Sequence, residues 1–387
     1  MNSPKNPFST PLARKLAVAA AFTSIMTAGM AGAAEATDGV SPARLARLTC
    51  GIGLSDWASR LPDLDQERRS GNLAKDVTLI KAMGFRHVRF LMTEETVVNM
   101  ETPTVLDPVK LGRFDAALDM LLNGGLGIII DFNPRDTLKQ ALVKDDAAVD
   151  EFVNLWRVLA KHLATRDPEM VFLEVMNEPV MRDTDRWNVI QKKALATMRQ
   201  SAPRHTLIAT SAEWSEIYML PPLEVVADKN VVYNVHFYEP VRFTHQDAPW
   251  VAGDWVKGLR NAPYPSSPEA VARVLDALPD DAARTLMTKY GKENWNADKL
   301  EEMIAEGAAW AKKHGVHLTC NEFGVYRKAP AADRNRCIED TRKALEKHHF
   351  GWTMWDYATE FGVATGEPGQ RVADTDTLKA LGLAPRS

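Results

Sequence analysis

The chain has 387 residues, 45% of them hydrophobic and 25% charged, so it is long enough to bury a large core. A net charge of −4 excludes the strongly basic surface that is typical of nucleic-acid-binding proteins. Beyond the N-terminal region, no stretch reaches the ~20 apolar residues that a membrane-spanning helix needs. We therefore expect a globular protein that binds neither nucleic acid nor, once any leader is removed, a membrane.

The first 33 residues have the pattern of a secretory signal peptide. Lys5, Arg14 and Lys15 precede an apolar run over residues 16–30, and small residues up to Ala33 offer a cleavage site. An uncleaved anchor helix fits less well, because the apolar run is short and includes Thr, Ser and Gly. We expect residues 1–33 to be removed and residues 34–387 to form one secreted or periplasmic domain.

Three cysteines are too few for a disulfide framework in an exported protein. Cys50 and Cys320 fall in apolar runs, where a free thiol behaves as a small hydrophobic side chain. A single bridge, for example between Cys320 and Cys337, would still leave one thiol free.

From residue 49 onward, segments typical of strands alternate with segments typical of helices. The expected strands are 50–54, 85–91, 126–132, 170–176, 205–210, 231–236, a seventh directly after Gly315, and 351–355. The expected helices are 72–83, 108–123, one around 149–163, 184–201, one near 222–227, 297–314, 333–348 and one from 375. Eight strands alternating with eight helices predict an α/β protein, a single (β/α)8 TIM barrel.

Two of the predicted strands end in a carboxylate. The apolar run 170–176 stops at Asn177-Glu178-Pro179, where the proline cannot donate to a sheet and ends the strand. The strand after Gly315 ends in Asn321-Glu322. Barrel enzymes place their chemistry at the C-terminal ends of strands, and a pair of carboxylates is the minimum equipment for cleaving a glycosidic bond. Glu174, inside its strand, is expected to be structural.

Four motifs in this order carry a resemblance: Asn177-Glu178-Pro179, His236-Phe237-Tyr238, Asn321-Glu322-Phe323-Gly324, and the pair Trp352 and Trp355. Together they resemble glycoside hydrolase family 5, the cellulase-type retaining β-glycosidases. The resemblance covers most of the chain after about residue 48. It implies a (β/α)8 catalytic domain that hydrolyses a β-linked polysaccharide or oligosaccharide.

The resemblance also implies roles for individual residues. Glu178 corresponds to the acid/base and Glu322 to the nucleophile of a double displacement. Arg89 at the end of the second strand and Tyr238 after the sixth would donate hydrogen bonds to the nucleophile. The acid/base must be protonated when it acts, whereas the nucleophile must be ionised, so their surroundings must differ.

Asn177 would bind the 2-hydroxyl of the reacting sugar, and Trp355 would be the flat platform beneath it. Each supporting residue has a structural alternative: the arginine could bridge carboxylates, the tryptophan could cap the core, and His236 could be a buried core histidine. Two further acidic residues at strand ends, Asp56 and Asp131, are expected to be structural or to contact substrate.

The sequence departs from the family pattern after the third strand. Where the family usually has a histidine two residues after the strand aspartate, this chain has Asn133, which can hydrogen-bond but cannot carry a proton. We interpret the change as altered recognition of the sugar chain, with catalysis intact.

The connection over residues 239–296 is far longer than the usual βα loop of roughly 2–6 residues. Its aromatic residues, which include Trp250 and Trp255, would either stack on sugar rings or pack the loop on itself. We expect one of these two tryptophans to line the active-site cleft.

The sequence therefore predicts an exported, retaining endo-β-glucanase. A β-mannanase or an exopolysaccharide-cleaving enzyme of the same family is the alternative, and a non-catalytic polysaccharide-binding barrel is the alternative of another class. No metal-binding or dinucleotide-binding motif occurs in the sequence, so we expect neither a metal nor a cofactor. We expect a monomer.

Overall fold

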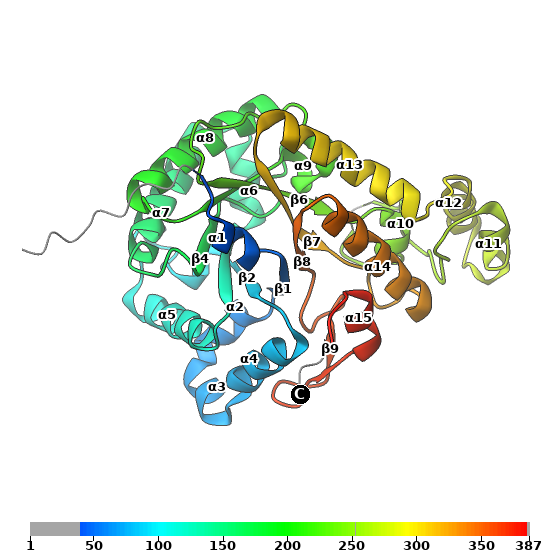
Figure 1. Cartoon of the computed structure of the whole chain (residues 1–387), viewed down its shortest axis with the longest axis horizontal. Coiled ribbons are helices and arrows are strands. Elements are labelled where there is room, and N and C mark those ends of the chain that lie inside the picture. Colours follow the sequence, from blue (N-terminus) through cyan, green and yellow to red (C-terminus); the bar gives the residue numbers. More distant parts are fainter. Residues whose placement is uncertain (1–38, 252, 385–387) are drawn as a thin grey trace, which may run out of the picture. The chain divides into compact units, whose positions relative to one another are not determined.

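A computed structural model describes residues 39–251 and 253–384, and eight parallel strands of this part form a closed barrel (Figure 1). Neighbours in the barrel are neighbours in the sequence, and β8 pairs with β1 to close it. The prediction of a (β/α)8 barrel is confirmed. The strands are β1 Cys50–Leu54, β2 His87–Met92, β3 Gly127–Phe132, β4 Val171–Glu174, β5 Leu207–Thr210, β6 Val231–Phe237, β7 His317–Phe323 and β8 Gly351–Met354.

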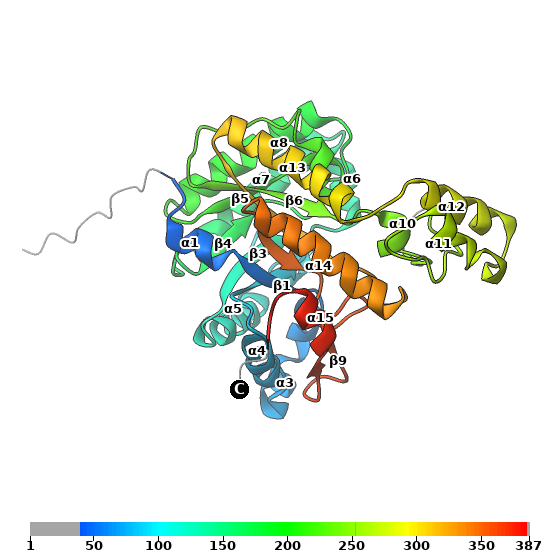
Figure 2. The same ribbon diagram turned by 45° about the vertical axis from the view of Figure 1, so that its right-hand side comes forward.

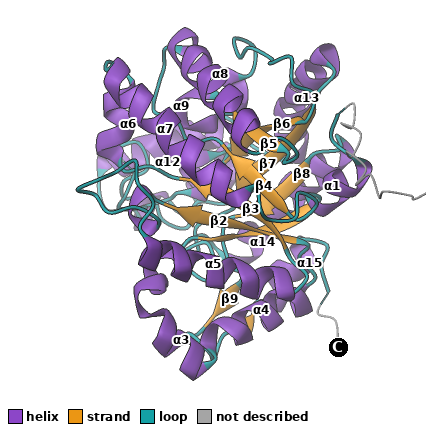
Figure 3. Ribbon diagram, turned by 90° about the vertical axis from the view of Figure 1, so that its left-hand side faces the viewer, coloured by secondary structure: helices purple, strands orange, loops and turns teal. Residues whose placement is uncertain are grey.

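The helices surround the strands, as Figure 3 shows. The larger ones are α4 Asn72–Met83, α5 Pro108–Asn123, α7 Asp146–Leu163, α8 Thr184–Ser201, α12 Asp281–Lys292, α13 Ala297–His314 and α14 Ala331–Lys347. Shorter ones are α1 Pro42–Arg47, α2 Trp57–Arg60, α3 Leu64–Ser70, α6 Asp136–Leu142, α9 Ala212–Ser215, α10 Val241–Thr244, α11 Pro268–Ala272 and α15 Thr375–Ala380. The short strands β9 Ala364–Thr365 and β10 Val372–Ala373 pair antiparallel near the C-terminal end.

Helix α7 illustrates how the sequence produces this packing. The Asp145 carboxylate caps it by accepting from the Ala147 amide, and its apolar residues repeat at helical spacing. Phe152 and Trp156 both pack on Phe132 of β3, with ring centroids 5.9 and 5.8 Å apart. Each fully buried aromatic side chain contributes about 1.5–3 kcal/mol. These contacts hold α7 against β3.

The barrel interior is apolar at one level and charged at the next. Buried side chains of four consecutive strands form the apolar level: Ile129, Phe172, Ile208 and Val232. Fully buried charged side chains from neighbouring strands follow it: Arg89, Asp131 and Glu174. The register pairs Asp131 with Glu174, so these carboxylates lie at one height near the C-terminal ends of their strands.

The long connection after β6 is a folded insertion that contains α10, α11 and α12, and it projects from the barrel in Figure 2. The connection, which we expected to be a long loop, contains helices, and its buried residues belong to the main hydrophobic core of the protein. Phe243, Tyr264 and Tyr290 are buried, and the Tyr264 hydroxyl donates to Asp340 of α14 at 3.0 Å. These aromatics therefore pack the insertion on itself, whereas Trp250 and Trp255 remain 49% and 42% exposed.

The helix expected near residues 222–227 is absent, and that prediction was wrong. Side chains satisfy the amides there instead: Asn188 Oδ1 accepts from Glu224 N at 3.0 Å, and the Tyr233 hydroxyl accepts from Val226 N at 2.9 Å. A short 3-10 turn, Ile217–Met219, precedes this stretch.

The three cysteines are free thiols in this structure, with Cys320 and Cys337 buried. The expected signal peptide lies outside the described residues, so it stays a prediction. Among the residues that the structure describes, no helix has the length and apolar character to cross a membrane.

Candidate active site

A fully buried arginine organises the C-terminal end of the barrel. Arg89 donates through Nε and Nη2 to the Glu174 carboxylate, at 3.0 and 2.8 Å. Its Nη1 donates to Glu322 Oε1 at 2.5 Å, and Nη2 also donates to Asn177 Oδ1 at 2.8 Å. Asp131 Oδ1 lies 3.1 Å from Nη2. One guanidinium thus connects β2, β3, β4 and β7, and it fixes the position of Glu322.

The arginine is surrounded by three carboxylates, which determines its charge and theirs. Burial alone would lower the pKa of Arg89, but Asp131, Glu174 and Glu322 raise it well above its usual value. Burial raises the pKa of Asp131 well above its usual range, and neither of its carboxyl oxygens has a hydrogen-bond partner among the described residues. Removing the arginine would leave buried carboxylates without their cation, at a cost of about 3–5 kcal/mol.

Glu174 is structural, as expected. Besides the two bonds from Arg89, its carboxylate accepts from Asn321 Nδ2 at 2.8 Å and from Asn234 Nδ2 at 3.3 Å. It is fully buried and does not line the cleft. Asp56 is also structural, because its carboxylate accepts from Arg371 Nη2 at 2.8 Å.

Glu322 has a second donor. The Tyr238 hydroxyl donates to Glu322 Oε2 at 2.9 Å, while the tyrosine ring packs edge-on against His245 and Phe361 at 4.9 and 5.9 Å. Burial, together with the charges of Glu322 and Glu178, raises the pKa of Tyr238 well above its usual value, so the phenol keeps its proton and acts as a donor. Arginine and tyrosine together stabilise the negative charge of Glu322.

Glu178 lies opposite, at the end of β4. Its backbone adopts a left-handed φ of 47°, a strained conformation that is common at functional sites. Its carboxylate is 23% exposed and is 3.0 Å from His236 Nδ1, which in turn lies 3.5 Å from Glu322 Oε2. One oxygen of each glutamate and a ring nitrogen of His236 all lie within 4.8 Å of one another. The two candidate catalytic carboxylates therefore meet at the histidine.

Burial alone would raise the pKa of Glu178, but the hydrogen bond and charge of His236, with Lys139 and Arg89, outweigh it and lower the pKa. Glu178 is joined to His236 by a hydrogen bond of 3.0 Å.

The remaining predicted residues line the same space. Asn177 Nδ2 donates to Asn133 Oδ1 at 3.3 Å. Asn133, which departs from the family pattern, therefore helps to position Asn177, the residue expected to bind the 2-hydroxyl of the sugar. Trp355 follows β8, and the absence of a side chain at Gly53 lets its ring approach β1, since a Cβ there would lie 2.8 Å from Trp355 Cε3.

These residues open into a cleft of about 1000 Å³. Glu178, Glu322, Asn133, Asn177, Tyr238 and Trp355 line it. Among the described residues, the aromatic side chains that remain largely exposed are four, and all four line this cleft: Trp214, Tyr218, Trp250 and Trp255. Aromatic faces that remain exposed in a cleft suit the apolar faces of sugar rings.

Two groups near Glu178 were not predicted from the sequence. Trp214, Glu216 and Tyr218 lie on the connection after β5, which carries no recognisable motif. Lys139, a buried lysine on α6, is one of the charges that lower the pKa of Glu178. A lysine within a short amphipathic segment has the pattern of an exposed residue, so only the tertiary structure reveals it.

Glu178, His236 and Glu322 are also close enough to converge on a metal ion. The same three atoms are already linked to one another by a hydrogen bond and a close contact. The prediction that no metal is needed stays a prediction.

The family model for cellulase (glycosyl hydrolase family 5) matches residues 60–360. The chain belongs to this family. The resemblance of the four motifs is thereby confirmed, and this member of glycosyl hydrolase family 5 is a glycoside hydrolase.

Its relatives agree with this assignment. Endoglucanase C of Acetivibrio thermocellus is 26% identical over 314 residues, which cover 79% of this chain and 90% of that protein. Cellodextrinase A of Ruminococcus flavefaciens is 24% identical over 307 residues, which cover 77% and 82%. The crystal structure of the endoglucanase Cel5A from the hyperthermophilic Thermotoga maritima has the same fold, with a TM-score of 0.69 at 24% identity over 87% of this chain and 98% of that one.

Proposed function

We propose that this family 5 enzyme is an exported endo-β-glucanase that cleaves its substrate by a double displacement with retention of configuration. The observation that carries the proposal is the convergence of Glu178 and Glu322 on His236, with Arg89 and Tyr238 donating to Glu322 and not to Glu178. A carboxylate held by Arg89 and Tyr238 is suited to be the nucleophile. The partly exposed carboxyl of Glu178, which receives neither of these donors, is suited to be the acid/base.

The spacing of the carboxylates favours retention over inversion. Retaining glycosidases place their two carboxyl groups about 5–5.5 Å apart, whereas inverting ones leave roughly 6.5–9.5 Å for a water molecule. Here an oxygen of Glu178 and an oxygen of Glu322 lie within 4.8 Å. That distance leaves no room for a water on the far face of the sugar.

In the first step, a carboxylate oxygen of Glu322 attacks the anomeric carbon, and the bond to the leaving oxygen breaks. The leaving oxygen takes a proton from the Glu178 carboxyl, which becomes a carboxylate. In the second step, Glu178 accepts a proton from water as the water oxygen bonds to the anomeric carbon, and the ester to Glu322 breaks. Arg89 and Tyr238 hold the nucleophile in position through both steps.

The supporting residues have corresponding roles in the proposal. Asn177, anchored by Arg89 and Asn133, presents its amide to the 2-hydroxyl of the reacting sugar. Trp355 forms the platform beneath that sugar. Trp250 and Trp255 on the insertion extend the binding surface along the cleft.

The substrate is a β-linked glucan cleaved within the chain, in keeping with a cleft of about 1000 Å³ that aromatic side chains line. Release of short units from a chain end is the second candidate, because a cellodextrinase is among the relatives. A β-mannan or an exopolysaccharide would require the same catalytic residues and differ only in the cleft wall, where Asn133 lies. A non-catalytic binding role is disfavoured by the intact hydrogen bonds of Glu322.

The decisive experiment is a product profile over β-1,4-glucan, β-1,3-glucan, β-mannan and bacterial exopolysaccharides, with Glu322→Ala as the inactive control. We expect β-glucan to be cleaved to oligosaccharides of mixed length, with a rapid fall in viscosity. Release of only one short product would contradict endo action. Turnover of none of these substrates, or equal turnover by Glu322→Ala, would overturn the proposal.

A further inference from the structure

A second pocket adjoins the active-site cleft on the side of β1 and β2. It has a volume of about 420 Å³, which is in the range of small-molecule sites. Ser55, directly after β1, and Leu91, near the end of β2, line both the pocket and the cleft. The other lining residues come from the connections after β1 and β2 and from α5, and we call this space the β1–β2 pocket. Glu178 and Glu322 do not line it, so it is separate from the reacting groups.

Two basic side chains of α5 line the β1–β2 pocket. Lys110 and Arg113 are three residues apart, so they lie on the same face of the helix, and both are half-buried. Lys110 donates through Nζ to the Val98 carbonyl at 2.9 Å, which uses one of its three donors. The Arg113 guanidinium has no hydrogen-bond partner among the described residues, and neither cation has a carboxylate of that part of the chain within ion-pair distance.

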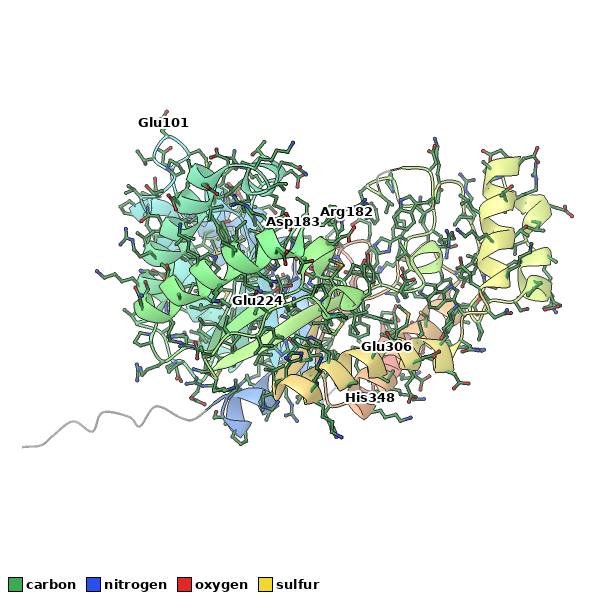
Figure 4. All side chains as sticks on the ribbon, turned by 90° about the horizontal axis from the view of Figure 1, so that it is seen from above. Glu101, Arg182, Asp183, Glu224, Glu306 and His348 are labelled. Atoms are coloured by element: carbon green, nitrogen blue, oxygen red, sulfur yellow. The ribbon has the colours of Figure 1, made fainter. Side chains whose placement is uncertain are left out.

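The acidic residues on the neighbouring connection are engaged elsewhere. Asp107 caps α5, and its carboxylate accepts from two amides of the first turn. Glu95 lines the pocket but pairs with Arg135 at 3.4 Å, and Glu94 accepts from the amide of the same arginine at 3.0 Å. Glu101 is exposed, and Figure 4 shows it projecting from the connection after β2, away from the body of the barrel. The pocket therefore has positive charge that none of these carboxylates neutralises.

The two charges do not stabilise the helix that carries them. Lys110 lies in the first turn of α5, where the helix dipole disfavours a cation, and that turn holds no acidic residue. Arg113 is partly removed from water without gaining an ion pair, and such a charge lowers stability. An anion in the pocket would compensate both residues, which gives them a reason in binding and none in folding.

We propose, on the basis of the proposed function, that the β1–β2 pocket binds an acidic substituent of the glucan, a carboxylate held by Arg113 and Lys110. The guanidinium fork matches the two oxygens of a carboxylate, and the ammonium adds a third donor. Leu61 and Pro62 give the same pocket an apolar lining for the carbon atoms that carry the carboxylate. The main chain of the glucan stays in the cleft, and its substituent enters the pocket where Ser55 and Leu91 line both. The substrate class is then a β-glucan that carries carboxylates.

The test compares two soluble β-1,4-glucans, carboxymethyl cellulose and hydroxyethyl cellulose, with matched chain length and degree of substitution. Their substituents are similar in size, but only the carboxymethyl group is charged. We expect the wild type to have a kcat/KM on the carboxymethyl polymer that is higher by about fivefold or more at low salt. Arg113→Gln should remove most of this preference by raising KM on the carboxymethyl polymer alone. Arg113→Lys, which keeps the charge but loses the fork, should retain part of it.

Arg273→Gln is the matched control for the change in net charge. Arg273, at the end of α11, is exposed and lines neither the pocket nor the cleft, so its replacement should leave kcat/KM on both polymers unchanged. Salt provides a measurement that needs no variant. Raising the ionic strength from about 0.01 M to about 0.1 M shortens the Debye length from about 30 Å to about 10 Å, so the preference of the wild type should fall. The double variant Lys110→Gln/Arg113→Gln should show no such fall.

Equal kcat/KM of the wild type on the two polymers would overturn the inference and leave the proposed function intact, because the uncharged polymer is still cleaved. An equal loss on both polymers in Arg113→Gln, or an equal loss of preference in Arg273→Gln, would overturn it as well. If the wild type cleaves neither polymer, the proposed function fails and the inference with it. Should Arg113→Gln not fold, Lys110→Gln provides the same comparison, and melting temperatures verify that each variant measured is folded.

Discussion

Replacing Glu178 by alanine separates its chemical role from a structural one. The side chain is 23% exposed, and among the described residues it forms one hydrogen bond, to His236. Losing a hydrogen bond to a charged group costs about 1.5–3 kcal/mol, so the variant folds with reduced but measurable stability. Glu322 differs, because its removal leaves the buried Arg89 with one carboxylate fewer and Tyr238 without an acceptor.

The expected kinetic effect depends on the leaving group. General acid catalysis contributes about 10²–10⁴-fold, which corresponds to about 2.7–5.5 kcal/mol of the barrier. We expect Glu178→Ala to lose this factor on oligosaccharides, whose leaving oxygen needs a proton. On a dinitrophenyl β-glycoside, which leaves without one, the first step should be nearly unaffected. The measurements are kcat/KM on both substrates and the melting temperature.

Azide distinguishes the two glutamates. In Glu178→Ala, azide attacks the glycosyl-enzyme without needing a base, so turnover is partly restored and the product is the β-glycosyl azide. In Glu322→Ala, azide can act only from the face that the nucleophile occupied, and the product is the α-glycosyl azide. The assignment of Glu178 is wrong if both substrates lose activity equally and azide restores none of it.

Three further predictions follow from the same geometry. Proton NMR of the first minutes of hydrolysis should show the β-anomer, as a carboxylate spacing within 4.8 Å requires, and an initial α-anomer would contradict the double displacement. Replacing Trp250 or Trp255 by alanine should raise KM on long oligosaccharides while leaving the shortest cleavable substrate nearly unchanged; variants that lose only thermal stability would assign both rings to packing. Burial lowers the pKa of His87 and of His205 to about 4, so the unfolded chain takes up protons below pH 6.5 that the folded one does not. Stability should therefore fall between pH 6.5 and 4 by up to about 1.4 kcal/mol per pH unit for each histidine, and a constant melting temperature over this range would refute the reasoning.

The candidate catalytic residues stand out in the sequence because local chemistry marks them. In the apolar strand that ends in Asn177-Glu178-Pro179, the proline ends the strand and leaves the carboxylate at the barrel rim. The long helices could also be predicted from the sequence, and α4, α5, α8 and α13 have the predicted bounds.

The two helices α11 and α12 of the insertion have capping residues in the sequence, but the high content of proline and aromatic residues in this segment favoured a loop. Ser267 caps α11 ahead of a proline, and Asp280 caps α12, both through side chains that accept from amides in the first turn. The many prolines and aromatics of the segment suggested a loop. These capping residues are the features from which two helices could have been predicted.

The strained turn after β5, residues 213–218, could not have been predicted. Left-handed turns are usually marked by glycine or asparagine, but Glu213, Trp214 and Ser215 occupy the conformation here. Tertiary contacts hold these residues in place: their backbone amides donate to the loop after β4, and Arg182 pairs with Glu213. A tryptophan in such a sequence has the pattern of a core residue, and only the fold reveals that it is exposed.

The contacts of Asn133 suggest what its departure from the family pattern changes. Its amide oxygen accepts from Asn177, so it positions the residue proposed to bind the 2-hydroxyl and carries no charge toward Glu178. Positive charge reaches Glu178 from other elements: His236 on β6, Lys139 on α6 and Arg89 on β2 all lower its pKa. Relative to the family pattern, Asn133 therefore places an uncharged group in the wall of the cleft, while the cationic groups around Glu178 remain. Because the wall changes and these charges do not, we expect Asn133 to affect which sugar chain binds.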